Sequence, residues 1–290
     1  MSDTPHIARS DTPSPSVADA ARAGEPDRYL AALLAPPAQR VALVALAAFS
    51  AELSKIPQRV VHEPAMGEIR LQWWRDALAM PAAIRTGHPV ADAVREAAQR
   101  HDLPIGLLET LVDGRSLLLA KGVPLDGGDF HDLLWKTEGA LFALGAGVVG
   151  LPAGADVDTA CAASGQAYGM VRLLLGLPRA LAQGYVPLAT AQLAAAGLTA
   201  EDLLSGAADA RIGRLLADCS AQIRRSLAVA RQHANRLPRA GRVGFLPLAL
   251  VEPYLRAIER AGPALLRQET SVAPLMRVCR IVAAHVFGRL

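Results

Sequence analysis

The chain has 290 residues, of which 52% are hydrophobic and only 4% aromatic, and its formal net charge is +3. This length accommodates one large domain or two small ones, and the composition indicates an aliphatic core. The basic residues form no cluster with interleaved aromatic side chains, which argues against a nucleic-acid-binding protein.

The helical pattern follows a polar N-terminal segment. Residues 1–26 contain the tetrapeptide Ser-Asp-Thr-Pro twice, with too few apolar side chains to offset the entropy of ordering, so we expect a disordered tail. Residues 27–290 are predicted to form one all-α domain, because Ala and Leu dominate and no stretch alternates like a strand. The expected helices are 27–35, 37–54, 64–80, 90–101, 104–121, 129–150, 156–183, 188–196, 200–205, 207–236, 245–262 and 272–288.

Proline and capping residues set several of these boundaries. Pro57 is predicted to end the second helix, because a proline inside a helix removes a backbone hydrogen bond. Asp129 is predicted to cap the helix that follows it, with Asp126 in a Gly-rich turn. Gly145 to Gly150 match the spacing GxGxxG, but a helix precedes them where a dinucleotide site needs a strand. We expect these glycines, like Gly165 and Gly169, to permit close helix packing.

Two helical segments hold the candidate functional positions. The first runs from Leu46 to Ile56 and continues from Ile69 to Leu78, and the second runs from Gly165 to Ala180 and on to Leu188. Together they resemble the two motif segments of the squalene/phytoene synthase family, in residues spread from about Arg28 to about Gly262. The matching positions are Leu46, Ala48, Phe49, Trp74, Leu78, Leu174, Gly184, Tyr185 and Pro187. The resemblance implies an all-α isoprenoid-synthase-like helical bundle around a central cavity.

The resemblance also shows which residues are missing. The family joins two prenyl diphosphates head to head, and Mg²⁺ held by acidic residues neutralises the departing diphosphate. Here the acidic positions of the first motif hold Ser54, Lys55 and Gln58. In the second motif an Asn position holds Arg172, and the acidic positions hold Gly176, Arg179 and Ala180. A lysine repels Mg²⁺, and Gly or Ala offers no side-chain oxygen. We therefore expect a pseudoenzyme with no catalytic residue, metal or cofactor.

One subgroup of the family is a closer match. The stretch Phe49-Ser-Ala-Glu-Leu53, followed by Met66 to Trp74, is similar to a mitochondrial complex I assembly factor with a phytoene synthase-like domain that also lacks the acidic motifs. This resemblance implies a non-catalytic role in assembling respiratory NADH dehydrogenase, with its subunits or assembly intermediates as partners. The alternatives are a Mg²⁺-dependent prenyltransferase that uses carboxylates from outside the motifs, and an isoprenoid- or lipid-binding protein.

Polar residues near the first motif suggest what a surviving pocket would contain. We expect Glu52 to pair with an arginine of a neighbouring helix, such as Arg70 or Arg172, because buried acids are usually paired. If the family fold holds, Lys55, Arg172 and Arg179 converge into a basic mouth for a prenyl diphosphate or an anionic lipid. The alternative is a cavity filled by Leu and Met side chains.

The cysteines and the apolar segments predict a cytoplasmic protein of a bacterium. Cys161, Cys219 and Cys279 lie far apart, without metal-binding spacing, as is typical of a reducing compartment. The N-terminal residues show no apolar signal core, and no apolar run reaches the ~18 residues that a membrane span needs. The excess of arginine leaves peripheral contact with an anionic inner membrane open.

Overall fold

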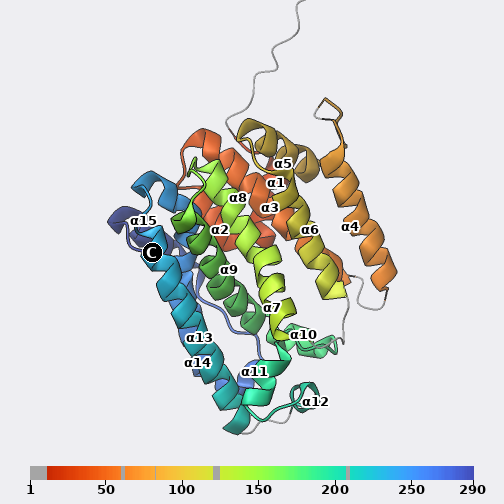
Figure 1. Ribbon diagram of the computed structural model, residues 1–290, viewed down its shortest axis with the longest axis vertical. Helices are drawn as coiled ribbons and strands as arrows, with labels where there is room; N and C mark the ends of the chain where they lie inside the picture. The colour runs from red at the N-terminus through yellow and green to blue at the C-terminus, as the bar shows by residue number, and fades with distance from the viewer. Residues whose placement is uncertain (1–11, 60–62, 82, 120–124, 207–209) are drawn as a thin grey trace, which may run out of the picture.

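The computed structural model describes residues 12–59, 63–81, 83–119, 125–206 and 210–290. Within these ranges the chain is built from helices, and its bridge Leu125–Ala189 belongs to no strand. The all-α prediction is therefore confirmed (Figure 1). The α-helices are α1 Pro15–Gly24, α2 Pro26–Ala32, α3 Pro37–Arg59, α4 Pro64–Ala79, α5 Pro89–Arg100, α6 Ile105–Leu119, α7 Gly127–Leu134, α8 Ala140–Val148, α9 Ala155–Leu175, α10 Leu177–Ala182, α11 Thr190–Ala195, α12 Ala200–Leu204, α13 Ala210–Ala234, α14 Val251–Ala261 and α15 Pro274–Phe287. A π-helix, η1, spans Trp135–Gly139, and two 3₁₀ helices span Arg239–Leu250 (η2) and Gly262–Leu266 (η3).

Helix α1 corrects the expectation of a disordered tail through residue 26. Val17 and Ala21, one turn apart, are buried, and the helix packs against α3. The contact is close, since a Cβ on Gly24 would lie 2.5 Å from the Cβ of Ala51. Only a narrow apolar stripe is needed to hold so short a helix, and the Pro- and Ser-rich composition around it conceals that stripe. Residues 1–11 lie outside the described ranges.

Helix α3 runs through the middle of one of the two hydrophobic clusters. It continues past Pro57 to Arg59, contrary to the expected break. Pro57 lies in the last turn, where few backbone hydrogen bonds remain to be lost. The helix is long and apolar enough to cross a membrane, but 67% of its most apolar stretch is buried inside the protein. It is therefore a core helix, packed against α1, α2, α5 and α8.

The predicted helix 129–150 is divided into α7, η1 and α8. Asp126, rather than Asp129, is the N-cap of α7, and its carboxylate accepts a hydrogen bond from the Asp129 backbone N–H at 2.8 Å. In η1 the backbone is wider than in an α-helix, and α9 packs against it. A Cβ on Gly165 would lie 2.6 Å from the backbone of Gly139, so the prediction that Gly165 permits close packing is confirmed.

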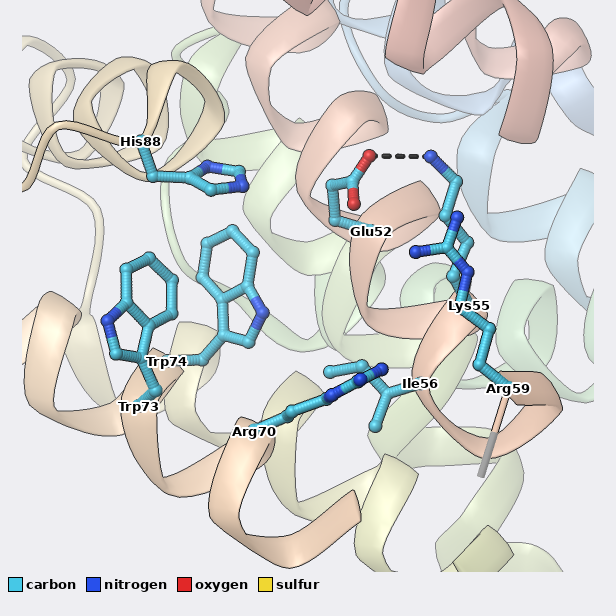
Figure 2. Close-up of a pocket in the computed structure, with 8 residues that line it drawn as sticks. All are labelled: Glu52, Lys55, Ile56, Arg59, Arg70, Trp73, Trp74 and His88. Atoms are coloured by element: carbon cyan, nitrogen blue, oxygen red, sulfur yellow. Dashed lines mark hydrogen bonds and ion pairs between the residues drawn. The ribbon is translucent and has the colours of Figure 1, made fainter. Parts of the chain in front are cut away.

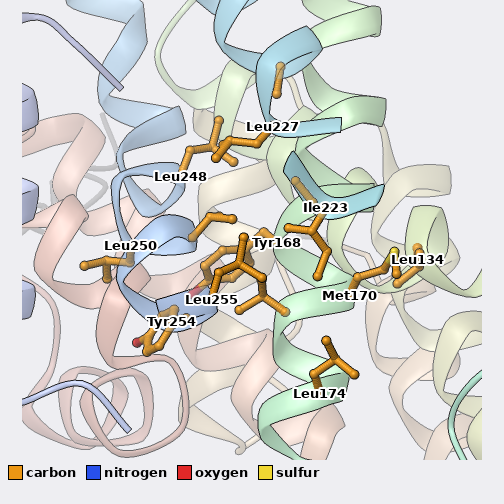
Figure 3. Close-up of a cluster of buried hydrophobic side chains, with 14 of the residues drawn as sticks. Leu134, Tyr168, Met170, Leu174, Ile223, Leu227, Leu248, Leu250, Tyr254 and Leu255 are labelled. Atoms are coloured by element: carbon orange, nitrogen blue, oxygen red, sulfur yellow. The ribbon is translucent and has the colours of Figure 1, made fainter. Parts of the chain in front are cut away.

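The second hydrophobic cluster joins α9, α13, α14 and η2 (Figure 3). Ile223 and Leu227 of α13 belong to this cluster together with Met170 and Leu174 of α9, and side chains of η2 and α14 complete it. The expected helix 156–183 is divided at Gly176 into α9 and α10, and the expected helix 245–262 is preceded by η2. Helices α3 and α9, which carry the two motif segments, thus belong to different clusters, with a polar interior between them.

Candidate functional site

The polar interior between α3 and α9 is centred on Glu25, which lies at the junction of α1 and α2. Glu25 is 1% exposed. Its Oε1 accepts a hydrogen bond from the Ser50 hydroxyl of α3 at 2.9 Å, and its Oε2 accepts one from Arg172 of α9. A residue that the sequence analysis assigned to the tail therefore connects the two motif helices.

Glu138, supplied by the π-helix η1, is the second buried carboxylate of this interior. Its Oε2 accepts a hydrogen bond from Arg28 Nη2 at 2.8 Å, and its Oε1 lies 3.5 Å from Arg172 Nε. The Arg28 guanidinium also lies over the Phe142 ring, 4.3 Å from the centroid. Arg28 and Arg172 thus hold Glu138 between them while also contacting Glu25.

A third arginine, Arg115 of α6, faces the same interior. Its side chain is buried, and its Nε and Nη2 have no hydrogen-bond partner among the described residues. Burial lowers the pKa of Arg115, and the charges of Arg172 and Arg28 add to this effect while Glu138 opposes it. We call Glu25, Arg28, Arg115, Glu138 and Arg172 the Arg–Glu cluster. It sets three guanidinium groups against two carboxylates.

The charges of the Arg–Glu cluster shift the pKa values of its members. Burial alone would raise the pKa of Glu138, but the guanidinium groups of Arg172 and Arg28 lower it below its ordinary value. Burial likewise opposes the charged form of Arg172, yet Glu25 and Glu138 raise the pKa of its guanidinium well above its ordinary value. Both shifts favour the charged forms, so the cluster is a set of buried ion pairs at neutral pH.

Asp27, the residue immediately before Arg28 in α2, forms a second buried centre. Its Oδ2 accepts hydrogen bonds from the Tyr168 hydroxyl at 2.8 Å and the Tyr254 hydroxyl at 2.7 Å. Its Oδ1 lies 3.4 Å from Arg277 Nη1 of α15. Burial and the charge of Asp27 raise the pKa of both tyrosines, so they act as neutral donors. This carboxylate joins α2, α9, α14 and α15.

The side chains at the motif positions of the first segment contact different partners. The Ser54 hydroxyl donates to the backbone carbonyl of Ser50 at 2.7 Å, within α3. Gln58 Oε1 lies 3.5 Å from Arg179 Nη1, so the ends of the two motif segments meet there. Lys55 pairs with Glu52 at 2.6 Å. Glu52 therefore takes its partner from its own helix, rather than Arg70 or Arg172.

In the second segment, Gly176 is the C-cap of α9 and the Ala180 side chain is buried in α10. Arg172 belongs to the Arg–Glu cluster, whereas the exposed Arg179 pairs with Glu269 at 3.6 Å. Of the three residues expected to form a basic mouth, Arg172 pairs with Glu25 in the buried interior, whereas Lys55 and Arg179 pair with Glu52 and Glu269. One reason is that α9 ends at Leu175, with Gly176 as its C-cap, so Arg172 and Arg179 belong to different helices.

Glu52 and Lys55 instead line a groove between α3, α4 and the start of α5, which we call the outer groove (Figure 2). Its volume is about 230 Å³. Arg70 and Trp73 line it from α4, and the Trp74 and His88 rings meet edge to face with centroids 5.1 Å apart. Along α4, Trp74 is buried, but Trp73 is 41% and Ile69 is 62% exposed.

Comparison with known proteins decides the family of this fold. A sequence model of the family described as squalene/phytoene synthase matches residues 21–277. The chain belongs to the squalene/phytoene synthase family. Its resemblance to that family, inferred above from scattered motif positions, is thereby confirmed over most of its length.

Characterised relatives of this family member carry the name of an assembly factor. Complex I assembly factor 6 of Rattus norvegicus is 28% identical over 257 residues, covering 86% of this chain and 76% of the relative. The Homo sapiens protein of the same name is 26% identical and covers 85% and 75%. Two of the solved structures that it resembles are named synthases. A squalene synthase, HpnC, from Alicyclobacillus acidocaldarius has a TM-score of 0.74 at 18% identity, covering 85% of this chain and 93% of that one. A dehydrosqualene synthase has a TM-score of 0.79 at 13% identity, covering 94% and 95%.

The residues present do not fit the Mg²⁺ ions that the family implies. The motif positions carry no carboxylate, and the two buried carboxylates between the motif helices, Glu25 and Glu138, are already paired with guanidinium groups. Within the described ranges, no group of three or more His, Cys, Asp or Glu side chains is placed to hold a metal ion. A divalent cation entering this interior would meet an excess of positive charge, which opposes its binding.

Sequence reasoning missed most of the Arg–Glu cluster. Of its five members it singled out only Arg172, because the other four lie outside the family motifs. Glu25 stands just before Pro26, at the border of what was read as a tail, and Glu138 stands in a segment read as ordinary helix. One signal was available: Glu138 is flanked by the apolar runs 133–135 and 140–144, and an acid in such surroundings requires a partner.

Proposed function

We propose that this chain is a non-catalytic member of the squalene/phytoene synthase family that supports assembly of respiratory NADH dehydrogenase, complex I. The observation that carries the proposal is the Arg–Glu cluster, which fills the interior between the two motif helices with buried ion pairs. The names of the relatives, complex I assembly factor 6, support the assembly role.

Electrostatics supports the loss of prenyl transfer. Ionisation of an allylic diphosphate requires cations beside the leaving group, and the family supplies Mg²⁺ bridged to carboxylates. Here the carboxylates of Glu25 and Glu138 form ion pairs with Arg28 and Arg172. Moving either arginine away would leave a buried carboxylate with fewer positive partners. The fold is thereby stabilised by the same groups that exclude the metal ions. The subunits or assembly intermediates of complex I are its proposed partners.

The catalytic half of the proposal is tested with labelled farnesyl and geranylgeranyl diphosphate. The purified chain is incubated with each substrate and Mg²⁺, beside an active dehydrosqualene synthase as the positive control. We expect the control to form a head-to-head product and this chain to form none. A product at a rate above that of a heat-denatured sample would establish the prenyltransferase alternative.

The assembly half is tested by deleting the gene and measuring assembled complex I and NADH oxidation in membranes. We expect both to fall and to recover when the wild-type chain is restored. A variant with Ser54→Ala and Gln58→Ala should restore them equally, because neither side chain enters the Arg–Glu cluster. Normal complex I in the deletion strain would exclude the assembly role.

Binding of an isoprenoid or lipid without turnover is the second candidate, favoured by the outer groove. Lys55, Arg59 and Arg70 place basic groups beside the indole rings of Trp73 and Trp74. The groove is smaller than the pockets that usually enclose a whole ligand, which favours capture of a headgroup or chain end. Calorimetric titration with farnesyl diphosphate tests this candidate. Binding that Arg70→Ala weakens would support it, whereas no heat at high micromolar ligand would exclude it.

A further inference from the structure

The C-terminal helix α15 turns an apolar face away from the protein. Its inward positions are Arg277, Ile281 and Ala284, spaced four and three residues apart. The opposite side of the same helix carries only apolar side chains at its centre, in the order Leu275, Cys279, Val282 and Val286. An amphipathic surface helix normally has polar residues at these outward positions, so α15 has an apolar face without a partner among the described residues.

Further apolar residues widen this face on both sides. Leu275 and Phe287 are 74% and 73% exposed, the largest values among the large hydrophobic side chains of the described residues. We call the whole surface the α15 ridge; it consists of Leu275, Met276, Val278, Cys279, Val282, Val286 and Phe287. With 14 residues, α15 is about 21 Å long. Contiguous exposed apolar surface on this scale is uncommon in monomeric proteins and marks an interaction site.

The protein holds α15 firmly in place, so the ridge is not the face of a frayed terminus. Arg277 anchors the helix to the buried Asp27, with 3.4 Å between Nη1 and Oδ1. At the other end, Arg239 donates to the carbonyl of Val286, and Arg242 Nη1 donates to the carbonyl of Gly288 at 3.1 Å. These bonds satisfy carbonyl groups that a helix C-terminus leaves without partners. The inward side of α15 packs on η2 and α2 at one edge of the molecule (Figure 1).

The surroundings of the α15 ridge are basic. Residues 270–290 contain three arginines and one histidine but no Asp or Glu. Arg280 and Arg289 are exposed, and η2 adds Arg239 and Arg242 at the C-terminal end of the helix. An apolar helix face with basic flanks is the pattern of helices that lie in the interface of an anionic bilayer. The apolar side chains enter the acyl boundary, while the arginines contact headgroup phosphates.

We propose that the α15 ridge docks this protein on an anionic membrane surface, with α15 lying in the plane of the interface. Charge separates this occupant from a second copy of the chain. Two ridges packed antiparallel would bring together the two Arg280 side chains, which lie near the middle of the helix, whereas anionic lipid neutralises them. This inference stands apart from the proposed assembly function, since it rests on the surface of α15 alone.

The first test measures cosedimentation with vesicles of phosphatidylcholine, with and without phosphatidylglycerol. We expect the wild-type chain to bind the anionic vesicles, and to bind less as salt is raised. The double variant Leu275→Glu, Val282→Glu should lower partitioning roughly ten-fold or more, because it places two charges in the apolar face. Leu204→Glu is the matched control, since Leu204 is an exposed leucine of α12, at a distant edge of the molecule (Figure 1).

A site-specific test uses the ridge cysteine. Cys279 is exposed, while Cys161 and Cys219 are buried, so a polarity-sensitive thiol dye labels the ridge selectively. We expect its emission to shift to shorter wavelength on anionic vesicles. In a Cys279→Ser background, a dye at Ser205→Cys beyond α12 should not shift. Arg280→Gln with Arg289→Gln should weaken binding and flatten its salt dependence.

Three outcomes would overturn the proposal. The wild-type chain does not bind anionic vesicles, or the Leu275→Glu, Val282→Glu variant binds as well as wild type. In the third, the wild-type chain is a dimer that this variant dissociates, which assigns the ridge to a second copy. Circular dichroism melts establish that the variants fold. Complementation of the gene deletion is scored separately, so failure of membrane docking and failure of the assembly role are distinguished.

Discussion

Arg172 occupies a family position for asparagine and bridges both carboxylates of the Arg–Glu cluster. Its replacement by alanine leaves Glu25 and Glu138 buried with fewer positive partners, so we expect a loss of about 3–5 kcal/mol in the free energy of unfolding. Urea denaturation followed by circular dichroism measures it. Arg179→Ala is the matched control, because that exposed pair with Glu269 should contribute less than about 1 kcal/mol. Equal effects would mean that the cluster does not hold the interior together.

Glu138 makes stability depend on pH in the acid range. The pKa of its carboxyl is lowered in the folded chain by Arg172 and Arg28, which outweigh the effect of burial. A lowered folded pKa stabilises the protein above the ordinary value of 4.5, and this stabilisation is lost as pH falls below it. We expect the free energy of unfolding to decrease on acidification below about pH 4.5, and the decrease to be smaller in Glu138→Gln. Identical slopes in the two proteins would contradict the assigned ion pairs.

At the scale of helices, the sequence predicts where helices form better than it predicts the residues at which they begin and end. The apolar period and the prolines place α4 and α5 within a residue or so, because those signals are local. The division of the expected helix 129–150 depends instead on tertiary packing, since η1 widens where Gly139 meets Gly165 of α9. No local pattern encodes that contact. Helix α1 was missed for the opposite reason, because its composition resembles that of a tail although two side chains suffice to dock it.

The contact of η1 with α9 yields a prediction with an internal control. Gly165→Ala would place a Cβ 2.6 Å from the Gly139 backbone, which cannot move like a flexible side chain, so we expect destabilisation of about 1–3 kcal/mol. Gly213→Ala in α13 would meet nothing within 4 Å and should stabilise the chain by about 0.5–1 kcal/mol through helix propensity. Thermal melts of the two variants should therefore move in opposite directions. A melt of Gly165→Ala at or above the wild-type temperature would refute the close contact.

At the scale of the whole molecule, the sequence predicts which helices enclose the candidate site but not which side chains fill it. The motif positions led to α3 and α9, and Gln58 and Arg179 do meet between them. The groups that fill the interior come from the α1–α2 junction, α6 and η1, and only the assembled fold brings them together. A buried ion pair between residues 28 and 138 has no signature in either segment alone. Arg172, expected at a basic mouth, pairs with Glu25 in this interior for the same reason.

The reactivity of the two buried cysteines shows whether the folded chain unfolds as one cooperative unit. Cys161 of α9 and Cys219 of α13 lie in the same hydrophobic cluster, and burial raises the pKa of each thiol to about 12. Since the thiolate is the reactive form, both should resist an aromatic disulfide reagent in the native protein, whereas the exposed Cys279 reacts at once. We expect one fast thiol per chain in buffer, none after Cys279→Ser, and simultaneous reaction of the other two in denaturant at the rate of unfolding. If Cys161 or Cys219 reacts in buffer before the helical circular dichroism signal is lost, α9 and α13 separate locally. In that case the Arg–Glu cluster, which depends on Arg172 of α9, does not hold the two hydrophobic clusters together.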